Sequence, residues 1–274
     1  MKRIRNRIKG FSLLELVIVI VITAILAAII ATFIRQPIDA YIDSVRRAAL
    51  TDQADTVIRR MARDIRKALP NSVRISADRQ CIEFIPTKTG GRYRAQKNNS
   101  GQGDPLDFTT ADGSFDMYGL NSALPADRQI QAGDQIAVYN LGIAGANAYN
   151  GDNTSTVAGV GTGDLPNETK IILAAPKQFP LTSASKRFQV IPGNENIVSF
   201  VCNGGTLYRN SNYGYAISCP AAGGAILAQH VSSCDFAYDH SNPRNALVQM
   251  AINMTTDGGE TVRLYHEAHI GNSP

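Results

Sequence analysis

The sequence predicts an α+β protein: a long N-terminal helix, membrane-spanning in its first half, packs on an antiparallel β-sheet body that carries long loop insertions. Three observations predict this class. Residues 16–34 form an uncharged apolar segment, and apolar residues then recur at helical spacing up to residue 69. Runs of β-branched residues follow residue 70, and polar, glycine-rich segments at 86–133 and 141–169 interrupt them.

The positive charge of the chain is confined to its N-terminus. The formal net charge is +4, but residues 1–10 hold five basic residues and no acid, so the remaining chain has 22 basic and 23 acidic residues and a net charge of −1. A nucleic-acid-binding protein needs a basic patch on its body. No long basic run remains there, so we expect no nucleic-acid partner.

Residues 16–34 are long enough to cross a bilayer. These 19 residues would form a helix of about 29 Å, which matches a hydrocarbon core of about 30 Å. The basic residues before the span predict a cytoplasmic N-terminus and a body on the other side of the membrane. A secretory signal peptide has a shorter apolar stretch of about 7–15 residues. It also has no need of Glu15, since a carboxylate in a membrane span costs up to about 3 kcal/mol.

The hexapeptide Gly10-Phe11-Ser12-Leu13-Leu14-Glu15 lies between this basic segment and the span. It resembles the processing site of type IV prepilins and of type II secretion pseudopilins. The resemblance implies that residues 1–10 are a leader peptide, that a prepilin peptidase/N-methyltransferase cleaves between Gly10 and Phe11, and that Phe11 is then N-methylated. It also implies that Glu15 meets the N-terminal amine of a neighbouring subunit during assembly.

The physical chemistry of Glu15 agrees with that role. Cleavage creates an ammonium group on Phe11, and pairing with an opposite charge relieves the penalty of a carboxylate buried without a partner. The amine of the same chain lies about one helical turn away and is an alternative partner. The residues do not decide between the two.

A second, amphipathic helical segment is expected at residues 38–69, after the transmembrane and assembly segment 11–34. Its apolar stripe, which we expect to bury against the following domain, consists of Ile38, Tyr41, Ile42, Val45, Ala49, Val57, Ile58, Met61, Ile65 and Leu69. The helix should end before Pro70, and Pro37 should kink it or mark a weak point. Type IV major pilins usually carry a proline where this chain has Thr32.

Residues 70–274 are expected to form a β-rich periplasmic or extracellular domain. The predicted strands are Val73–Ala77, Cys81–Ile85, Gln135–Asn140, Lys170–Ala174, Arg187–Ile191, Ile197–Cys202, Thr206–Arg209, Ala225–Tyr238, Ala246–Thr255 and Thr261–Ile270. Gly204-Gly205 and residues 257–259 are typical of hairpin turns. The segments 86–133 and 141–169 are expected to be long loops.

The four cysteines suggest two disulfides in an oxidising compartment. Cys202 and Cys219 bracket an apparent hairpin, so we expect that pair, which leaves Cys81 with Cys234. Four cysteines allow three pairings, and the sequence leaves the choice open.

Three C-terminal segments also carry a family resemblance. VCNGGTLYRN, SSCDFAYD and GGETVRLYHEAHIGN look like the MshO-like minor pilins of MSHA-pilus biogenesis, a group related to PilW minor pilins and J-type pseudopilins. The resemblance implies a minor pilin that assembles with other pilin subunits through its helix. It would be a single-pass inner-membrane protein first and then part of a surface pilus used in assembly and attachment. The alternatives are a J-type pseudopilin of type II secretion and a membrane-anchored ligand-binding domain.

No enzymatic motif and no cofactor or metal signature is present in the sequence. His266 and His269 are three residues apart on an expected strand and therefore face opposite sides. Asp104, Asp107, Asp112 and Asp116 could supply oxygen ligands to calcium, but their spacing fits no EF-hand. We therefore expect a protein that is not an enzyme and has no cofactor.

Overall fold

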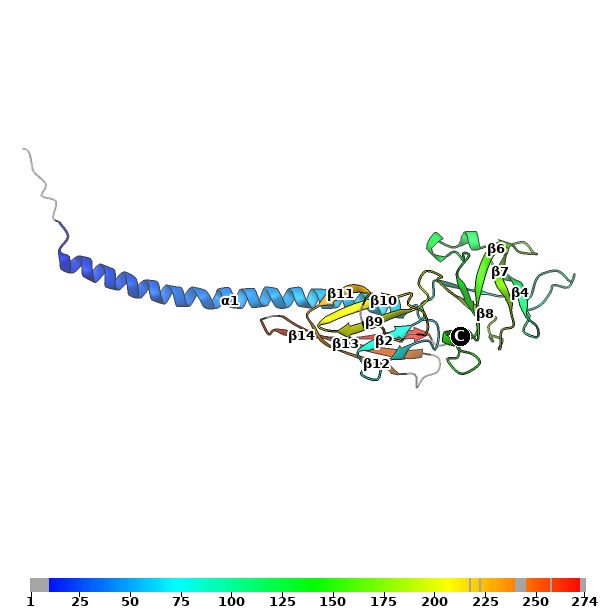
Figure 1. Ribbon diagram of the computed structural model, residues 1–274. Coiled ribbons are helices and arrows are strands. Elements are labelled where there is room, and N and C mark those ends of the chain that lie inside the picture. Colours follow the sequence, from blue (N-terminus) through cyan, green and yellow to red (C-terminus); the bar gives the residue numbers. More distant parts are fainter. Residues whose placement is uncertain (1–9, 217, 222, 240–244, 257, 272–274) are drawn as a thin grey trace, which may run out of the picture. The chain divides into compact units, whose positions relative to one another are not determined.

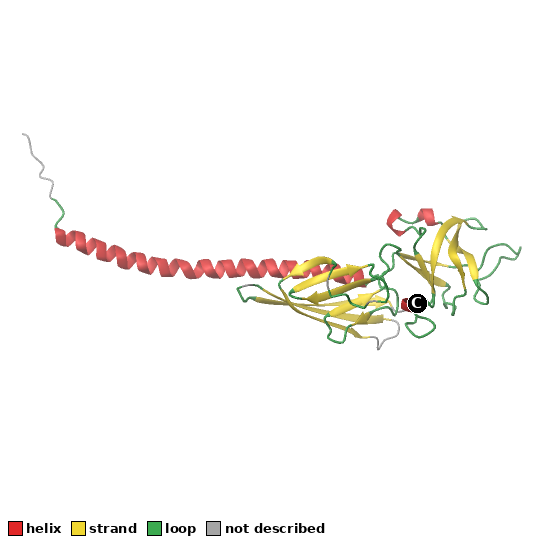
Figure 2. Ribbon diagram, viewed as in Figure 1, coloured by secondary structure: helices red, strands yellow, loops and turns green. Residues whose placement is uncertain are grey.

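The computed structural model describes residues 10–216, 218–221, 223–239, 245–256 and 258–271. One α-helix, α1 (Leu13–Ile65), precedes all the strands (Figures 1 and 2). The chain divides into two compact units, Met1–Ala49 and Leu50–Pro274. The strands are β1 (Arg74–Ile75), β2 (Cys81–Phe84), β3 (Thr89–Arg92), β4 (Asp112–Tyr118), β5 (Gln135–Ala137), β6 (Thr154–Thr162), β7 (Glu168–Lys177), β8 (Arg187–Ile191), β9 (Val198–Asn203), β10 (Thr206–Ser211), β11 (Ala225–Gln229), β12 (Val231–Asp239), β13 (Asn245–Thr255) and β14 (Thr261–Gly271).

Helix α1 runs through Pro37 without interruption and ends four residues earlier than expected. Beyond Ile65 the chain tightens into a 3₁₀-type turn, in which the N–H of Ala68 donates to the carbonyl of Ile65 at 2.9 Å. Pro70 and Asn71 follow, and Asn71 adopts a left-handed conformation with φ 57° before β1 begins.

The apolar stripe of α1 is buried only in the second compact unit. The buried helix residues are Leu50, Ala54, Val57, Ile58, Met61, Ala62 and Ile65. The earlier part of the expected stripe is exposed instead, with Tyr41 at 70% and Ile38 at 50%. The sequence pattern therefore predicted buried positions correctly from Val57 onward, missed Leu50, Ala54 and Ala62, and was wrong for the positions before Leu50, which are exposed.

Two antiparallel sheets enclose a hydrophobic core with the buried part of α1. The five-stranded sheet has the order β1-β2-β9-β10-β11, and the three-stranded sheet has the order β12-β13-β14. Side chains from both sheets and from α1 make up one core cluster, in which Met61, Phe84, Phe200 and Phe236 are fully buried. We call this part, residues 50–85 and 197–271 as far as they are described, the helix–sheet lobe. The antiparallel body on a long helix confirms the predicted fold class.

The segments expected to be long loops instead contribute β3, β4 and β6 to a third sheet, so that expectation was wrong. Six strands in the order β3-β8-β5-β6-β7-β4 form this sheet. Its two outer strands meet through a bridge between Tyr93 and Met117, which closes the sheet into a small barrel around its own core. We call residues 86–196 the barrel. Strand β6 escaped detection because it buries only one side chain, Val157, and shows no alternating apolar pattern.

The barrel is an insertion between two strands that are neighbours in the helix–sheet lobe. Strands β2 and β9 pair antiparallel, with Phe84 opposite Val198, and the barrel occupies the chain between them. Where the barrel meets the lobe, the side chain of Asn140 donates to the carbonyl of Pro70 at 2.7 Å and accepts from the N–H of Ala148 at 2.8 Å. The hydroxyl of Tyr149 donates to the carbonyl of Ser72 at 2.9 Å. The bonds to Pro70 and Ser72 join the barrel to the chain that follows α1, and the bond to Ala148 fixes the Asn140 side chain within the barrel.

Candidate functional site

The residues expected at the processing site lie at the start of α1. Gly10 and Phe11 precede the helix and are exposed, Phe11 at 79%. The N–H of Glu15 donates to the Ser12 hydroxyl at 3.2 Å, which makes Ser12 the N-cap. Ser12 and Glu15 thus have the spacing of a capping box, and an acid in the first turn also interacts favourably with the helix dipole. The sequence analysis missed the role of Ser12, although the S-x-x-E spacing signals it. Residues 1–9 lie outside the described part of the chain.

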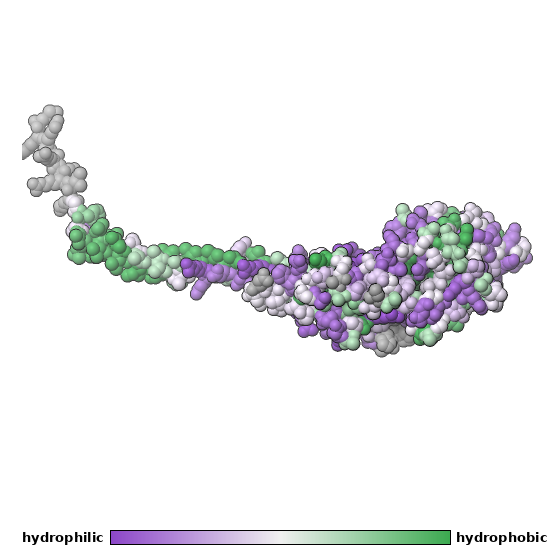
Figure 3. All heavy atoms as spheres, in the orientation of Figure 1, coloured by the Kyte–Doolittle hydropathy of each residue, from purple (hydrophilic) through white to green (hydrophobic). Residues whose placement is uncertain are grey.

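The first part of α1 exposes its apolar side chains to the surroundings. Figure 3 shows this part as almost uniformly hydrophobic. Within the described residues, α1 is the one helix that is long and apolar enough to cross a membrane. The hydroxyls of Thr23 and Thr32 each donate to the carbonyl four residues earlier, at 2.7 Å, so both polar groups are satisfied within the helix. This segment is suited to a lipid environment or to packing against other apolar helices.

A comparison with family models agrees with this geometry. Residues 5–31 match the prokaryotic N-terminal methylation motif. The N-terminus is that of a type IV pilin-like or pseudopilin protein. Proteins with this motif are structural subunits rather than enzymes, and the motif implies processing by prepilin peptidase and assembly with other pilins. No curated protein and no solved structure matches the chain.

The body of this pilin-like chain is cross-linked by two disulfides, but not in the expected pairing. The bonds are Cys81–Cys219 and Cys202–Cys234. Side chains alternate along a strand, and Cys81 pairs across the sheet with Val201, so Cys81 and Cys202 point to opposite faces. Cys202 shares the core side with Phe200 and meets Cys234 of β12 there. The apolar alternation before Cys202 could have indicated a partner inside the core.

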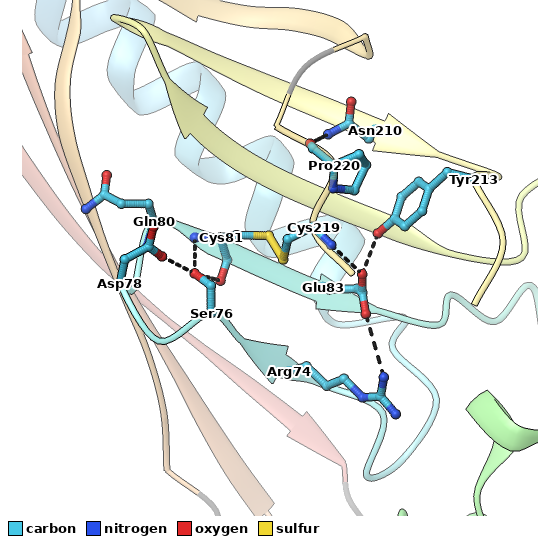
Figure 4. The surroundings of a disulfide bond; sticks show 10 residues. All are labelled: Arg74, Ser76, Asp78, Gln80, Cys81, Glu83, Asn210, Tyr213, Cys219 and Pro220. Carbon is cyan, nitrogen blue, oxygen red and sulfur yellow. Dashed lines mark hydrogen bonds and ion pairs between the residues drawn. A yellow bond between two sulfur atoms is a disulfide. The ribbon is translucent and has the colours of Figure 1, made fainter. Parts of the chain in front are cut away.

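Cys81 lies beneath a strap, which we define as the described residues of segment 212–224 between β10 and β11. Glu83, two residues further along β2, is 1% exposed. Its carboxylate accepts hydrogen bonds from the Tyr213 hydroxyl at 2.8 Å and from the N–H of Cys219 at 3.0 Å (Figure 4). Burial is the main cause that raises the pKa of Tyr213. The strap is therefore fixed to β2 by one covalent bond and two hydrogen bonds.

A cavity of about 370 Å³ lies beside the end of α1, lined mainly by charged and polar side chains. The guanidinium of Arg209 bonds to Asp64 at 2.9 Å and to Glu195 at 2.7 Å. Lys88 at its rim pairs with Asp134 at 2.6 Å. These ion pairs link α1, β10 and the barrel.

The residues considered as metal ligands in the sequence can be placed in the structure. In the described residues, no group of three or more His, Cys, Asp or Glu could hold a metal ion. His266 pairs with Met250 and His269 with Leu247, and their odd spacing places them on opposite faces of β14. Near Asp104, the ammonium of Lys170 lies 3.4 Å from the Asp104 carboxylate and 2.6 Å from that of Asp164. A lysine therefore pairs with Asp104, one of the four aspartates considered as calcium ligands.

Proposed function

We propose that the chain is a minor pilin of a type IV, MSHA-like pilus that helps to assemble the filament or lies near its tip. In this proposal, cleavage follows Gly10, Phe11 becomes the N-methylated first residue, and the body is periplasmic before assembly. The N-terminal methylation motif at residues 5–31 carries the proposal. The exposed apolar helix supports it, because such a surface requires either lipid or other helices around it.

The size of the body supports a low-copy role. Besides the helix–sheet lobe, the chain carries a complete barrel with a core of its own. A subunit with this additional domain is harder to repeat along a tightly packed filament than a subunit with a single lobe. Deletion of the gene should therefore reduce or abolish surface pili while leaving type II secretion unchanged. Loss of secretion with normal piliation would instead favour a pseudopilin.

Glu15 provides the test of the assembly mechanism, and Ser12 provides its matched control. In the proposal, the Glu15 carboxylate pairs with an N-terminal ammonium, whereas a mere helix cap would need only the capping interaction. Ser12→Ala removes the cap hydroxyl and costs roughly 1 kcal/mol of local helix stability, but it retains the carboxylate.

We expect Glu15→Ala to abolish incorporation into pili and Ser12→Ala to leave incorporation nearly unchanged, as measured by immunoblotting of sheared filaments. Mass spectrometry of the wild-type protein should find N-methylated Phe11 at its N-terminus. Equal defects in the two variants would mean that Glu15 acts only as a helix cap. A mature protein that begins elsewhere would contradict the proposal.

A further inference from the structure

The barrel is attached to the helix–sheet lobe by two adjacent strands, and each of these strands carries a cysteine. The chain enters the barrel after β2, which contains Cys81, and leaves it into β9, which contains Cys202. Without cross-links, a covalent path from α1 to the barrel exists only through β2. The chain beyond β9 continues to a C-terminus that has no backbone connection back to α1.

The disulfide between Cys81 and Cys219 changes this connectivity. It joins the chain that leaves the barrel to the strand that leads into it, at a sequence separation of 138 residues. The barrel then lies within a closed covalent ring and is suspended from Cys81 by both of its ends. The hydrogen bonds of Glu83 to Tyr213 and to the N–H of Cys219 fix the same junction non-covalently.

We propose that this ring carries mechanical force. A force applied between α1 and the barrel is divided at Cys81 between the chain that continues through β2 and the chain that returns from the barrel to Cys219. The inference rests on the proposed function, because a filament subunit that contacts a surface is pulled between its helix and its distal domain. The second disulfide, Cys202–Cys234, ties β9 to β12 and closes a smaller ring on the returning chain that contains neither α1 nor the barrel, which makes it a matched control.

The connectivity determines how far the protein can be stretched. Pro166 is an exposed residue in the turn between β6 and β7 of the barrel, and Asp52 is an exposed residue of α1. From Cys81 to Pro166 the chain has 85 residues, whereas from Pro166 to Cys219 it has 53. In the closed ring, the shorter segment, from Pro166 to Cys219, is fully extended first and limits the distance between the two handles. Opening the ring therefore adds 32 residues to the maximum extension, or roughly 110 Å at about 3.3–3.6 Å per residue.

The experiment is single-molecule force spectroscopy on the full chain in detergent micelles, with DNA handles attached through azide-bearing residues at positions 52 and 166. We expect Cys81→Ala/Cys219→Ala to lengthen the unfolded contour by roughly 110 Å relative to the wild type and to lower the force at which the helix–sheet lobe unfolds. Cys202→Ala/Cys234→Ala should change the contour by no more than a few residues and retain the higher force. If the first variant fails to fold, reduction of folded wild-type protein in the pulling chamber replaces it.

Three results would overturn the inference. An unchanged contour in Cys81→Ala/Cys219→Ala means that no ring encloses the barrel. A longer contour in both double variants means that Cys81 pairs with Cys202 or Cys234 instead of Cys219. A longer contour without a lower unfolding force means that the ring carries no load. None of these measurements involves a filament, so they leave the proposed pilin function untouched, and a failure of that function does not alter them.

Discussion

The side chain of Asn140 gives the sharpest test of how the barrel is held to the helix–sheet lobe. It is 1% exposed, and it bonds to the carbonyl of Pro70 and to the N–H of Ala148. Asn140→Ala leaves both of these backbone groups buried without their partner. Each such group costs about 1–3 kcal/mol, so we expect the free energy of unfolding to fall by about 2–6 kcal/mol. That is a large share of the stability of a typical domain, about 5–15 kcal/mol.

Asn98→Ala is the matched control. The Asn98 side chain also makes several hydrogen bonds, to the N–H groups of Ser100 and Gln102, but in an exposed turn where water can replace them. We expect it to cost less than about 1 kcal/mol. Urea denaturation followed by near-ultraviolet circular dichroism measures both, since nine of the ten tyrosines lie after residue 50 and the chain has no tryptophan. Equal losses in the two variants, or a loss below about 1 kcal/mol for Asn140→Ala, would refute the assignment of these bonds as the fastening of the barrel.

Three further perturbations have defined outcomes. Burial raises the pKa of Tyr215 to about 12, whereas tyrosine in the unfolded chain ionises near pH 10. The contribution of Tyr215 to the free energy of unfolding is therefore constant below about pH 10 and falls as pH rises toward 12. Tyr215→Phe should flatten this slope, as measured by urea titrations at several pH values. Hydrogen bonds from neighbouring threonines lower the pKa of Asp107 to about 2. Its contribution to the stability of the fold is therefore present above about pH 4 and is lost as pH falls toward 2. Asp107→Asn should remove this loss of stability at acid pH, as measured by thermal melts. Gly142→Ala should destabilise by about 1–3 kcal/mol, because φ is +70° and a Cβ would lie 2.8 Å from the carbonyl oxygen of Asn71, whereas Gly145→Ala, at φ +80° in open space, should cost less in the same melts.

The helix and the strands of the helix–sheet lobe were predictable because their apolar residues repeat with the period of their secondary structure. Strand β10 (Thr206–Ser211) contains the expected strand Thr206–Arg209, and Gly204-Gly205, both with positive φ, form the turn between β9 and β10. The buried face of α1 from Val57 onward follows from the spacing of its apolar side chains. In these elements, local sequence and tertiary burial favour the same structure.

The barrel and the disulfide pairing could not be predicted in the same way, because long-range contacts determine them. Strand β3 (Thr89–Arg92) buries no residue fully and contains two glycines, so its sequence resembles a turn, yet pairing with β8 makes it a strand. The cysteine pairing depends on which face of the five-stranded sheet each side chain occupies. That in turn depends on the pairing of β2 with β9, whose residues lie more than 100 positions apart.

The position of the insertion explains why a long loop and a covalent cross-link occur together. Phe84 and Val198 are paired neighbours, so the barrel begins and ends at almost the same point, and the helix–sheet lobe has a complete strand order without it. The free energy of closing a loop rises only slowly with its length, so a hairpin can accept a whole domain. The inserted domain gives the unfolded chain many more conformations. In the loop-closure model, restricting them stabilises the folded state by roughly 5 kcal/mol for Cys81–Cys219, which spans 138 residues, and by roughly 4 kcal/mol for Cys202–Cys234, which spans 32. The Cys81–Cys219 bond therefore restricts the unfolded chain at the same junction where, in our proposal, it divides an applied force. An insertion at this position adds a second domain without any change to the sequence of α1, through which pilin-like proteins assemble.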